Sequence, residues 1–168
     1  PVARYGKTLV FPLISRSAQD MITEAAHRTW LNQSVEDILA PEIPIIDAHN
    51  HLWHGYGKPV PWQPDYWHKE QAEDIASGHN IVATVFVECG YRYDDGVPSA
   101  LRPIGETRAI NSYADSFQKT TGSTCKAAAG IVGFADLTLG AEVEVTLEAQ
   151  LAAAPARFRG IRQITPWD

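Results

Sequence analysis

The sequence predicts an α/β fold with parallel strands, and the arrangement we favour is the N-terminal half of a (β/α)8 barrel, with about four βα units. Three observations support this prediction. Short apolar segments alternate with longer segments of helical periodicity. The connections from helix to strand are much shorter than two of those from strand to helix. Finally, no glycine-rich phosphate-binding loop follows the first strand, although an open doubly wound sheet of four strands remains the alternative.

Four apolar segments are the predicted strands. They span residues 43–48, 81–87, 126–134 and 158–164. The second is nearly all apolar and rich in β-branched residues, which is typical of a parallel strand buried on both faces. A half barrel would leave its first and fourth strands as open edges, because each would have a neighbour on one side only.

Three segments between these strands have the period of amphipathic helices. The segment 66–77 has three residues spaced by four, namely Trp67, Gln71 and Ile75. The segment 106–120 ends before Gly122 and carries an apolar stripe of Ile110, Tyr113, Ala114 and Phe117. The segment 141–154 carries a stripe of Val143, Leu147, Leu151 and Ala154.

The connections between these segments are unequal in length. Those after the helices are short, whereas residues 49–65 and 88–105, which follow the first two strands, are long and contain two of the five tryptophans. In α/β proteins ligands bind beyond the carboxyl ends of the strands. We therefore expect a functional site at this end of the sheet.

The N-terminal part of the chain lacks this alternation. We expect residues 1–40 to be an N-terminal extension, with a helix from about residue 21, and residues 41–168 to be the half barrel, truncated after its fourth strand. Two interpretations of residues 1–20 stay open, because Pro1 comes first and Met21 is the only methionine. They are non-native or upstream sequence before a natural start, or an arm of a longer chain.

Composition excludes several classes of partner. The 168 residues include 20 acidic and 14 basic side chains, a formal net charge of −6, so there is no basic footprint for nucleic acid. The longest early apolar run, residues 9–14, is too short to cross a membrane. Cys89 and Cys125 are expected at opposite ends of neighbouring strands, beyond disulfide reach. We therefore expect a cytoplasmic protein with reduced thiols.

The chemistry of the first strand lies in a His-x-His sequence. His49 and His51 stand two residues apart, and Asp47 precedes them by one more step of the same alternation. Side chains at i and i+2 of a strand share a face, so both imidazoles are expected to point at one ion at the carboxyl end. The alternative is a pair of hydrogen-bonded structural histidines. Asp47 lies one step deeper in the strand, where it could accept a hydrogen bond from a residue that supports the metal ligands.

Residues 41–53, Pro-Glu-Ile-Pro-Ile-Ile-Asp-Ala-His-Asn-His-Leu-Trp, resemble the opening strand of the amidohydrolase superfamily, closest to its amidohydrolase-related branch of lactonases and decarboxylases. Residues 85–89 and 157–162 are similar to the second and fourth strands of that branch. The resemblance covers about residues 30–168. It implies a (β/α)8 barrel in which His49 and His51 are metal ligands. Some lactonase-like members need no metal. We therefore expect a divalent ion, most readily zinc, with a metal-free site as the alternative.

Other polar residues are candidates for substrate binding. Arg162, near the end of the fourth strand, could hold a substrate carboxylate with its two-pronged guanidinium group. Glu88 ends the second strand, and we expect it to pair with Arg92 rather than to approach a metal. His54 could line the pocket or lie on the surface, whereas His68 and His79 are expected to face solvent. Four aromatic residues could form an apolar wall or hold down a loop: Trp53, Tyr56, Trp62 and Trp67.

Two functional hypotheses follow. In the first, the complete protein is a metal-dependent hydrolase that opens a lactone or ester of an acidic small molecule with metal-activated water, or a decarboxylase on the same scaffold. The proton-handling carboxylate is then expected beyond Asp168. In the second, this chain is an inactive fragment or a half-barrel module that needs its missing half. The oligomeric state and the substrate are not predicted.

Overall fold

The computed structural model describes residues 24–34, 36–55 and 65–164, and the chain divides into two units, Pro1–Glu36 and Asp37–Asp168. In the first unit, helix α1 (Glu24–Leu31) agrees with the helix expected from about residue 21. The alternatives for residues 1–20 concern a part of the chain outside the described residues.

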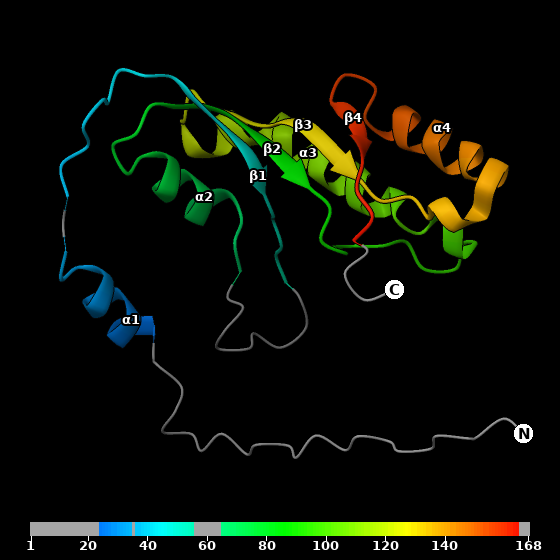
Figure 1. The fold of residues 1–168 in the computed structure, drawn as a ribbon, viewed down its shortest axis with the longest axis horizontal. Coiled ribbons are helices and arrows are strands. Elements are labelled where there is room, and N and C mark those ends of the chain that lie inside the picture. Colours follow the sequence, from blue (N-terminus) through cyan, green and yellow to red (C-terminus); the bar gives the residue numbers. More distant parts are fainter. Residues whose placement is uncertain (1–23, 35, 56–64, 165–168) are drawn as a thin grey trace, which may run out of the picture. The chain divides into compact units, whose positions relative to one another are not determined.

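Four parallel strands form the sheet of the second unit (Figure 1). They are β1 (Ile45–Asn50), β2 (Ile81–Val87), β3 (Lys126–Gly133) and β4 (Phe158–Ile161). Their order in the sheet is β1-β2-β3-β4, the order of the sequence. The predicted mixed α/β fold with parallel strands is therefore confirmed. β1 runs to Asn50 rather than ending at residue 48, so His49 belongs to the strand itself.

The helices of this unit form one layer. They are α2 (His68–Ile75), α3 (Ile104–Thr121) and α4 (Val143–Ala153), with short 3-10 helices η1 (Ser99–Leu101) and η2 (Leu137–Glu142) before α3 and α4. α3 packs on β3 and contacts both α2 and α4. A sheet whose strands follow the chain order with right-handed crossovers places its helices on one face, which agrees with this packing (Figure 1).

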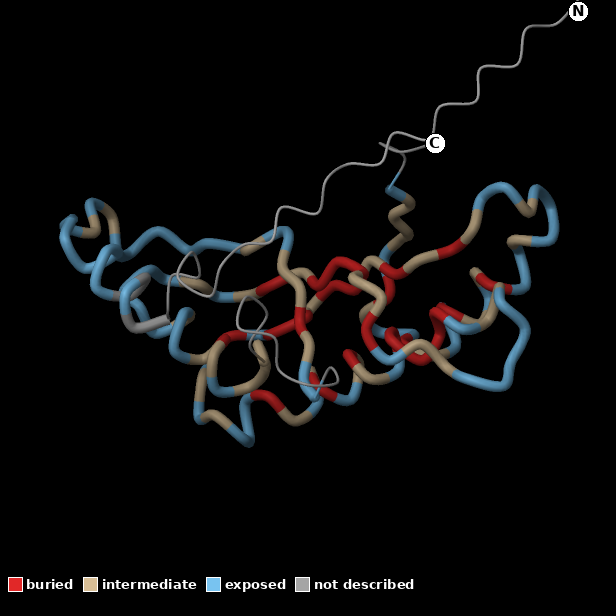
Figure 2. Tube along the Cα trace, turned by 90° about the horizontal axis from the view of Figure 1, so that it is seen from below, coloured by how far each residue is buried: buried red, intermediate tan, exposed pale blue. Residues whose placement is uncertain are grey.

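The core lies between the sheet and α3 (Figure 2). Ile110, Tyr113 and Phe117 are buried, as the stripe predicted, and they meet Phe86 and Ile131 from the strands. α3 ends where expected, because Gly122 adopts the left-handed conformation (φ 73°) and its N–H donates to the carbonyl oxygen of Gln118.

The predicted apolar stripe of α4 is only partly right. Ala154 is buried and Val143 and Leu147 are half-buried, but Leu151 is 51% exposed, and the polar Thr146 and Gln150 are fully buried. The Thr146 hydroxyl donates to the Ala100 carbonyl oxygen at 3.1 Å and the Gln150 amide to the Phe134 carbonyl oxygen at 3.0 Å. These contacts satisfy backbone groups of the loops, which an apolar face could not do.

Close packing at the start of α3 depends on a glycine. A Cβ atom at Gly105 would collide with the Arg92 carbonyl oxygen and would lie 2.8 Å from the Asp94 backbone nitrogen. We predict that Gly105→Ala lowers the free energy of unfolding by about 3 kcal/mol, measured by urea denaturation. Gly160→Ala is the matched control, because a Cβ atom at that position would meet nothing within 4 Å. Equal losses in the two variants would contradict the prediction.

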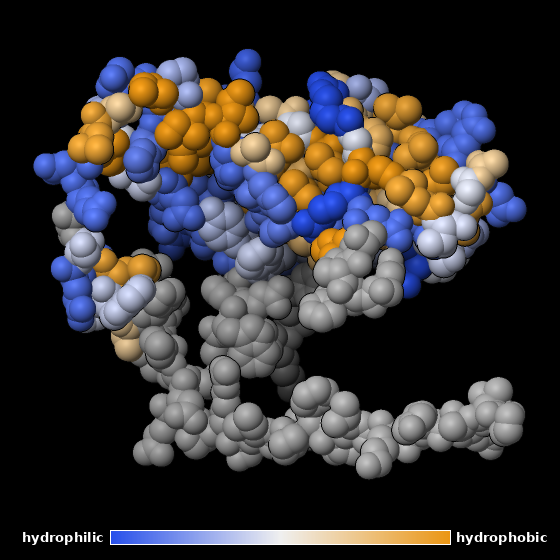
Figure 3. Space-filling view, in the orientation of Figure 1, coloured by the Kyte–Doolittle hydropathy of each residue, from blue (hydrophilic) through white to orange (hydrophobic). Residues whose placement is uncertain are grey.

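The sheet is open at both edges among the described residues. β1 pairs only with β2, and β4 pairs only with β3. Apolar side chains near the amino ends of the first two strands are exposed, including Ile46 at 62% and Val82 at 38%. Figure 3 shows apolar side chains gathered over the strands. Unpaired edges and exposed apolar residues are features that a folded sheet normally covers.

Candidate functional site

The two histidines of β1 lie side by side. The ring centroids of His49 and His51 are 5.0 Å apart, and the ring planes are nearly perpendicular, at 86°. The i, i+2 spacing predicted this neighbourhood. β1 is irregular between Asp47 and Asn50, where its register to β2 shifts.

His51 is held in one orientation by the neighbouring strand. Its Nδ1 lies 2.8 Å from the Val87 carbonyl oxygen. A carbonyl oxygen only accepts, so Nδ1 carries the hydrogen and the lone pair of the neutral ring is on Nε2. Metal-binding histidines are commonly oriented in this way. The backbone contact therefore leaves His51 able to act as a ligand through Nε2.

Asp47 does not orient either imidazole. One carboxylate oxygen accepts from the backbone N–H of His49 at 3.1 Å, and the other accepts from the Asn50 side-chain amide at 3.3 Å. Its function in the described structure is to fix the end of β1. Asp47 therefore accepts hydrogen bonds, but from the His49 backbone and the Asn50 side chain and not from either imidazole.

Arg162 reaches from the residue after β4 to the end of β2. Its Nε and Nη2 both lie 2.8 Å from the Glu88 Oε1 oxygen, and Nη2 also donates to the Glu88 carbonyl oxygen at 2.7 Å. The expected pairing of Glu88 with Arg92 is wrong, because Arg92 Nε donates to the Tyr91 hydroxyl at 3.0 Å. The sheet brings the ends of its strands together, so a residue far along the chain is the nearer partner.

The same guanidinium group meets the histidine pair. Arg162 Nη1 lies 3.5 Å from His49 Nε2, a long and weak hydrogen bond in which the histidine nitrogen accepts. Three of the residues proposed from the sequence for metal or substrate, His49, Glu88 and Arg162, therefore form one cluster, with His51 beside His49. They come from the ends of β1, β2 and β4.

This cluster supplies fewer ligands than a bound metal ion needs. Within the described ranges, no group of three or more His, Cys, Asp or Glu side chains is placed to hold one. A zinc site needs at least three protein ligands. The described residues fit as two of them, His51 through a lone pair already directed by its backbone contact, and His49 through a nitrogen that must first release Arg162.

Glu106 was not predicted from the sequence. It lies in the first turn of α3 and is 1% exposed. One oxygen accepts the backbone N–H groups of Cys89, at 3.0 Å, and Tyr91, at 2.7 Å, whereas its other oxygen has no partner among the described residues. Burial raises the pKa of Glu106 from 4.5 to about 7, against the effect of these hydrogen bonds, and Glu88 adds to the rise. Its position four residues before Ile110, on the buried stripe, was the available signal.

The two cysteines are free thiols, as expected. Cys89 Sγ lies 3.7 Å from the Leu52 carbonyl oxygen, and burial raises the pKa of this thiol to about 12. Burial also raises the pKa of Cys125. A reactive cysteine needs a lowered pKa, so neither thiol has the features of a nucleophile.

His54 belongs to a second group of residues. Its Nδ1 pairs with Asp65 at 2.9 Å and its ring stacks on Trp67. The expectation that His68 faces solvent is wrong, because its Nε2 bonds to the Ser116 hydroxyl at 2.9 Å and burial lowers its pKa. His79 is exposed, as expected. Of the proposed aromatic wall, Tyr56 and Trp62 lie outside the described residues, and Trp53 and Trp67 pack against the core.

Comparisons with protein-family models, with curated proteins and with solved structures find no match. Within the part of the chain that the structure describes, no helix has both the length and the apolar character needed to span a membrane. Fold and site thus define a mixed α/β protein with a cluster of two imidazoles and a carboxylate–guanidinium pair at the ends of its parallel strands.

Proposed function

We propose that this chain is the first half of a (β/α)8 barrel hydrolase of the amidohydrolase-related type, which opens a lactone or ester of a small acidic molecule. Sequential strand order, a single helix layer, unpaired edges and exposed apolar residues on the sheet support the half barrel. Four further βα units would pair with β1 and β4 and close the sheet.

The observation that carries the function is the meeting of His49, His51 and Arg162 at one end of the sheet. A divalent ion, zinc first, held in part by the two imidazoles would supply a water molecule of lowered pKa and polarise the substrate carbonyl. Glu88 engages Nε and Nη2 of Arg162 and so fixes the plane of its guanidinium group. Nη1, with its weak contact to His49, is the donor left for a substrate carboxylate.

The His51 ring is already oriented to bind a metal ion and need not move to do so. The Val87 carbonyl oxygen fixes its tautomer, so Nε2 is presented as a lone pair before any ligand arrives. The Glu88 carboxylate is occupied by two donors of Arg162, so it positions that side chain and is not presented to a substrate. The proton-handling carboxylate is therefore assigned to the second half of the barrel.

Metal binding gives the first test. We expect the gene product that contains this chain to bind Zn²⁺ in calorimetric titration, and the double variant His49→Ala/His51→Ala to lose more than about tenfold in affinity. His79→Ala, which removes an exposed imidazole elsewhere, should leave the affinity unchanged. Unchanged affinity in the double variant would exclude these residues as ligands.

Hydrolysis gives the second test, made on the gene product that contains this chain. A lactone bearing a carboxylate should be opened to the free acid, and the neutral methyl ester of the same lactone should react far more slowly, because Arg162 has no charge to bind. Equal rates for the two compounds would contradict the assigned substrate class. Release of CO2 instead of ring opening would identify a decarboxylase.

A further inference from the structure

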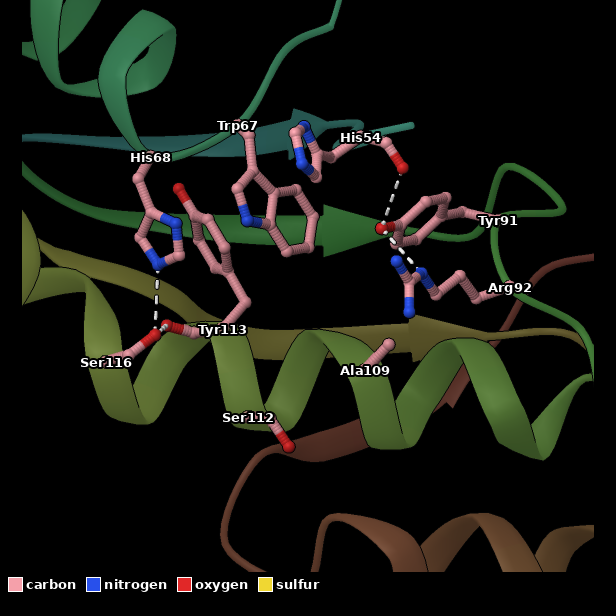
Figure 4. A pocket seen from close by; sticks show the side chains of 9 residues that line it. All are labelled: His54, Trp67, His68, Tyr91, Arg92, Ala109, Ser112, Tyr113 and Ser116. Carbon is pink, nitrogen blue, oxygen red and sulfur yellow. Dashed lines mark hydrogen bonds between the residues drawn. The ribbon is translucent and has the colours of Figure 1, made fainter. Parts of the chain in front are cut away.

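A cavity of about 390 Å³ opens between α2, α3 and the segment after β2 (Figure 4). It is distinct from the cluster around His49, since neither His49, His51 nor Arg162 lines it. Its volume lies in the range of small-molecule sites. No aspartate or glutamate among the described residues lines it, so nothing in this wall repels an anion.

Aromatic rings form one side of the cavity. The Trp67 ring centroid lies 4.5 Å from that of Tyr113 and 5.4 Å from that of Tyr91. His68 stacks on Tyr113 at 4.4 Å. Because these rings brace one another, they form a rigid apolar surface against which a planar ligand could pack with little loss of side-chain entropy.

A cation stands at one end of this surface. Arg92 has a left-handed backbone (φ 49°), its Nε donates to the Tyr91 hydroxyl at 3.0 Å, and its Cζ lies 5.6 Å from the Tyr91 ring centroid. These contacts hold the guanidinium group in place. Neither terminal nitrogen has a hydrogen-bond or carboxylate partner among the described residues. Figure 4 shows Arg92 above Ala109, next to the ring of Tyr91.

The imidazole at the other end is held by a hydrogen bond. The Ser116 hydroxyl donates to the Tyr113 carbonyl oxygen at 2.9 Å, so its oxygen must accept from His68 Nε2. Burial lowers the pKa of His68, against the effect of a backbone hydrogen bond to Tyr113, and the nearby His54 also lowers it. Arg92 carries the permanent positive charge among the described residues that line the cavity, and its location fixes the direction in which a ligand would lie.

We propose that this cavity binds a small planar aromatic carboxylate. The ring of the ligand lies against Trp67 over Ala109, and its carboxylate accepts from the terminal nitrogens of Arg92. The apolar ring of such a ligand matches the aromatic side of the cavity, and its carboxylate matches the cation at the Arg92 end. The site is independent of the proposed hydrolytic cluster, so it adds a second ligand-binding function to the chain.

Calorimetric titration with indole-3-carboxylate tests the proposal, with indole-3-carboxamide as the neutral isostere. We expect saturable binding of the carboxylate with a Kd on the order of 1 mM. The carboxamide, and the carboxylate on the variant Arg92→Met, should bind about 10- to 100-fold more weakly. Lys119→Met removes an exposed cation on the same α3 and should leave the affinity unchanged.

A variant that fills the cavity provides the second readout. Ala109→Leu should remove binding of both probes while the circular dichroism spectrum stays that of the parent chain, because leucine is a good helix former. His49→Ala/His51→Ala should bind the carboxylate like the parent, which separates this site from the hydrolytic cluster. Absence of saturable binding, equal affinity for the two probes, or unchanged affinity in Arg92→Met would overturn the proposal.

Discussion

Replacing Arg162 with alanine should lower the free energy of unfolding by about 3 kcal/mol and abolish lactone hydrolysis. The Glu88 side chain is 9% exposed and receives both Nε and Nη2 of Arg162, whose own side chain is 27% exposed. Without the guanidinium group, a nearly buried carboxylate loses its counter-charge and its donors, which costs several kcal/mol in comparable pairs. Urea denaturation measures the first effect and the rate with a carboxylate-bearing lactone the second.

Arg159→Ala is the matched control for this prediction. Arg159 lies on the same strand, but its guanidinium group donates only to the carbonyl oxygens of Phe158 and Ala156 among the described residues. We expect a loss below about 1 kcal/mol. The double variant Glu88→Ala/Arg162→Ala should be more stable than the sum of the single effects implies, since no charge is then stranded. Equal losses in Arg162→Ala and Arg159→Ala would refute the structural importance of the pair.

The strands and the histidine pair were predictable because both depend on local spacing. An apolar run bounded by turns is a strand signal, and residues 81–87 match β2 at both ends. The i, i+2 rule brought His49 and His51 together. The partner of Glu88 was not predictable in this way. Arg162 lies 74 residues further along the chain, and only the strand order of the sheet makes it nearer than Arg92.

Buried polar residues are a second feature, besides long-range ion pairs, that the periodicity of the sequence does not reveal. Thr146 and Gln150 are buried because backbone carbonyl oxygens of distant loops need donors at that face of α4. His68 is held by Ser116, 48 residues away. Patterns of apolar residues describe which face of a helix can be buried, but a polar side chain with a partner can be buried equally well.

Replacing Glu106 is the second change with a large expected effect, because this residue is a buried polar group whose partners lie on another segment of the chain. At pH 5 the neutral carboxyl group still accepts the N–H groups of Cys89 and Tyr91 through one oxygen. Glu106→Ala leaves these two donors without an acceptor in a buried setting, at about 1–3 kcal/mol each. We expect a loss of about 3 kcal/mol or more at pH 5, measured by urea denaturation. Glu106→Gln keeps the accepting oxygen and should lose less than about 1 kcal/mol.

The pH dependence of stability distinguishes the effect of the Glu106 charge from that of its hydrogen bonds. The pKa of Glu106 is raised from 4.5 in the unfolded chain to about 7 in the folded one, first by burial. The folded state therefore binds the proton more tightly. The stabilisation is complete below about pH 4.5 and is lost as the pH rises through about 7, a change of about 3 kcal/mol at most. Glu106→Gln has no such proton, so its stability relative to the parent should increase between pH 5 and pH 8. A difference between the two proteins that stays constant across this range would mean that Glu106 is charged throughout, and that burial does not govern its titration.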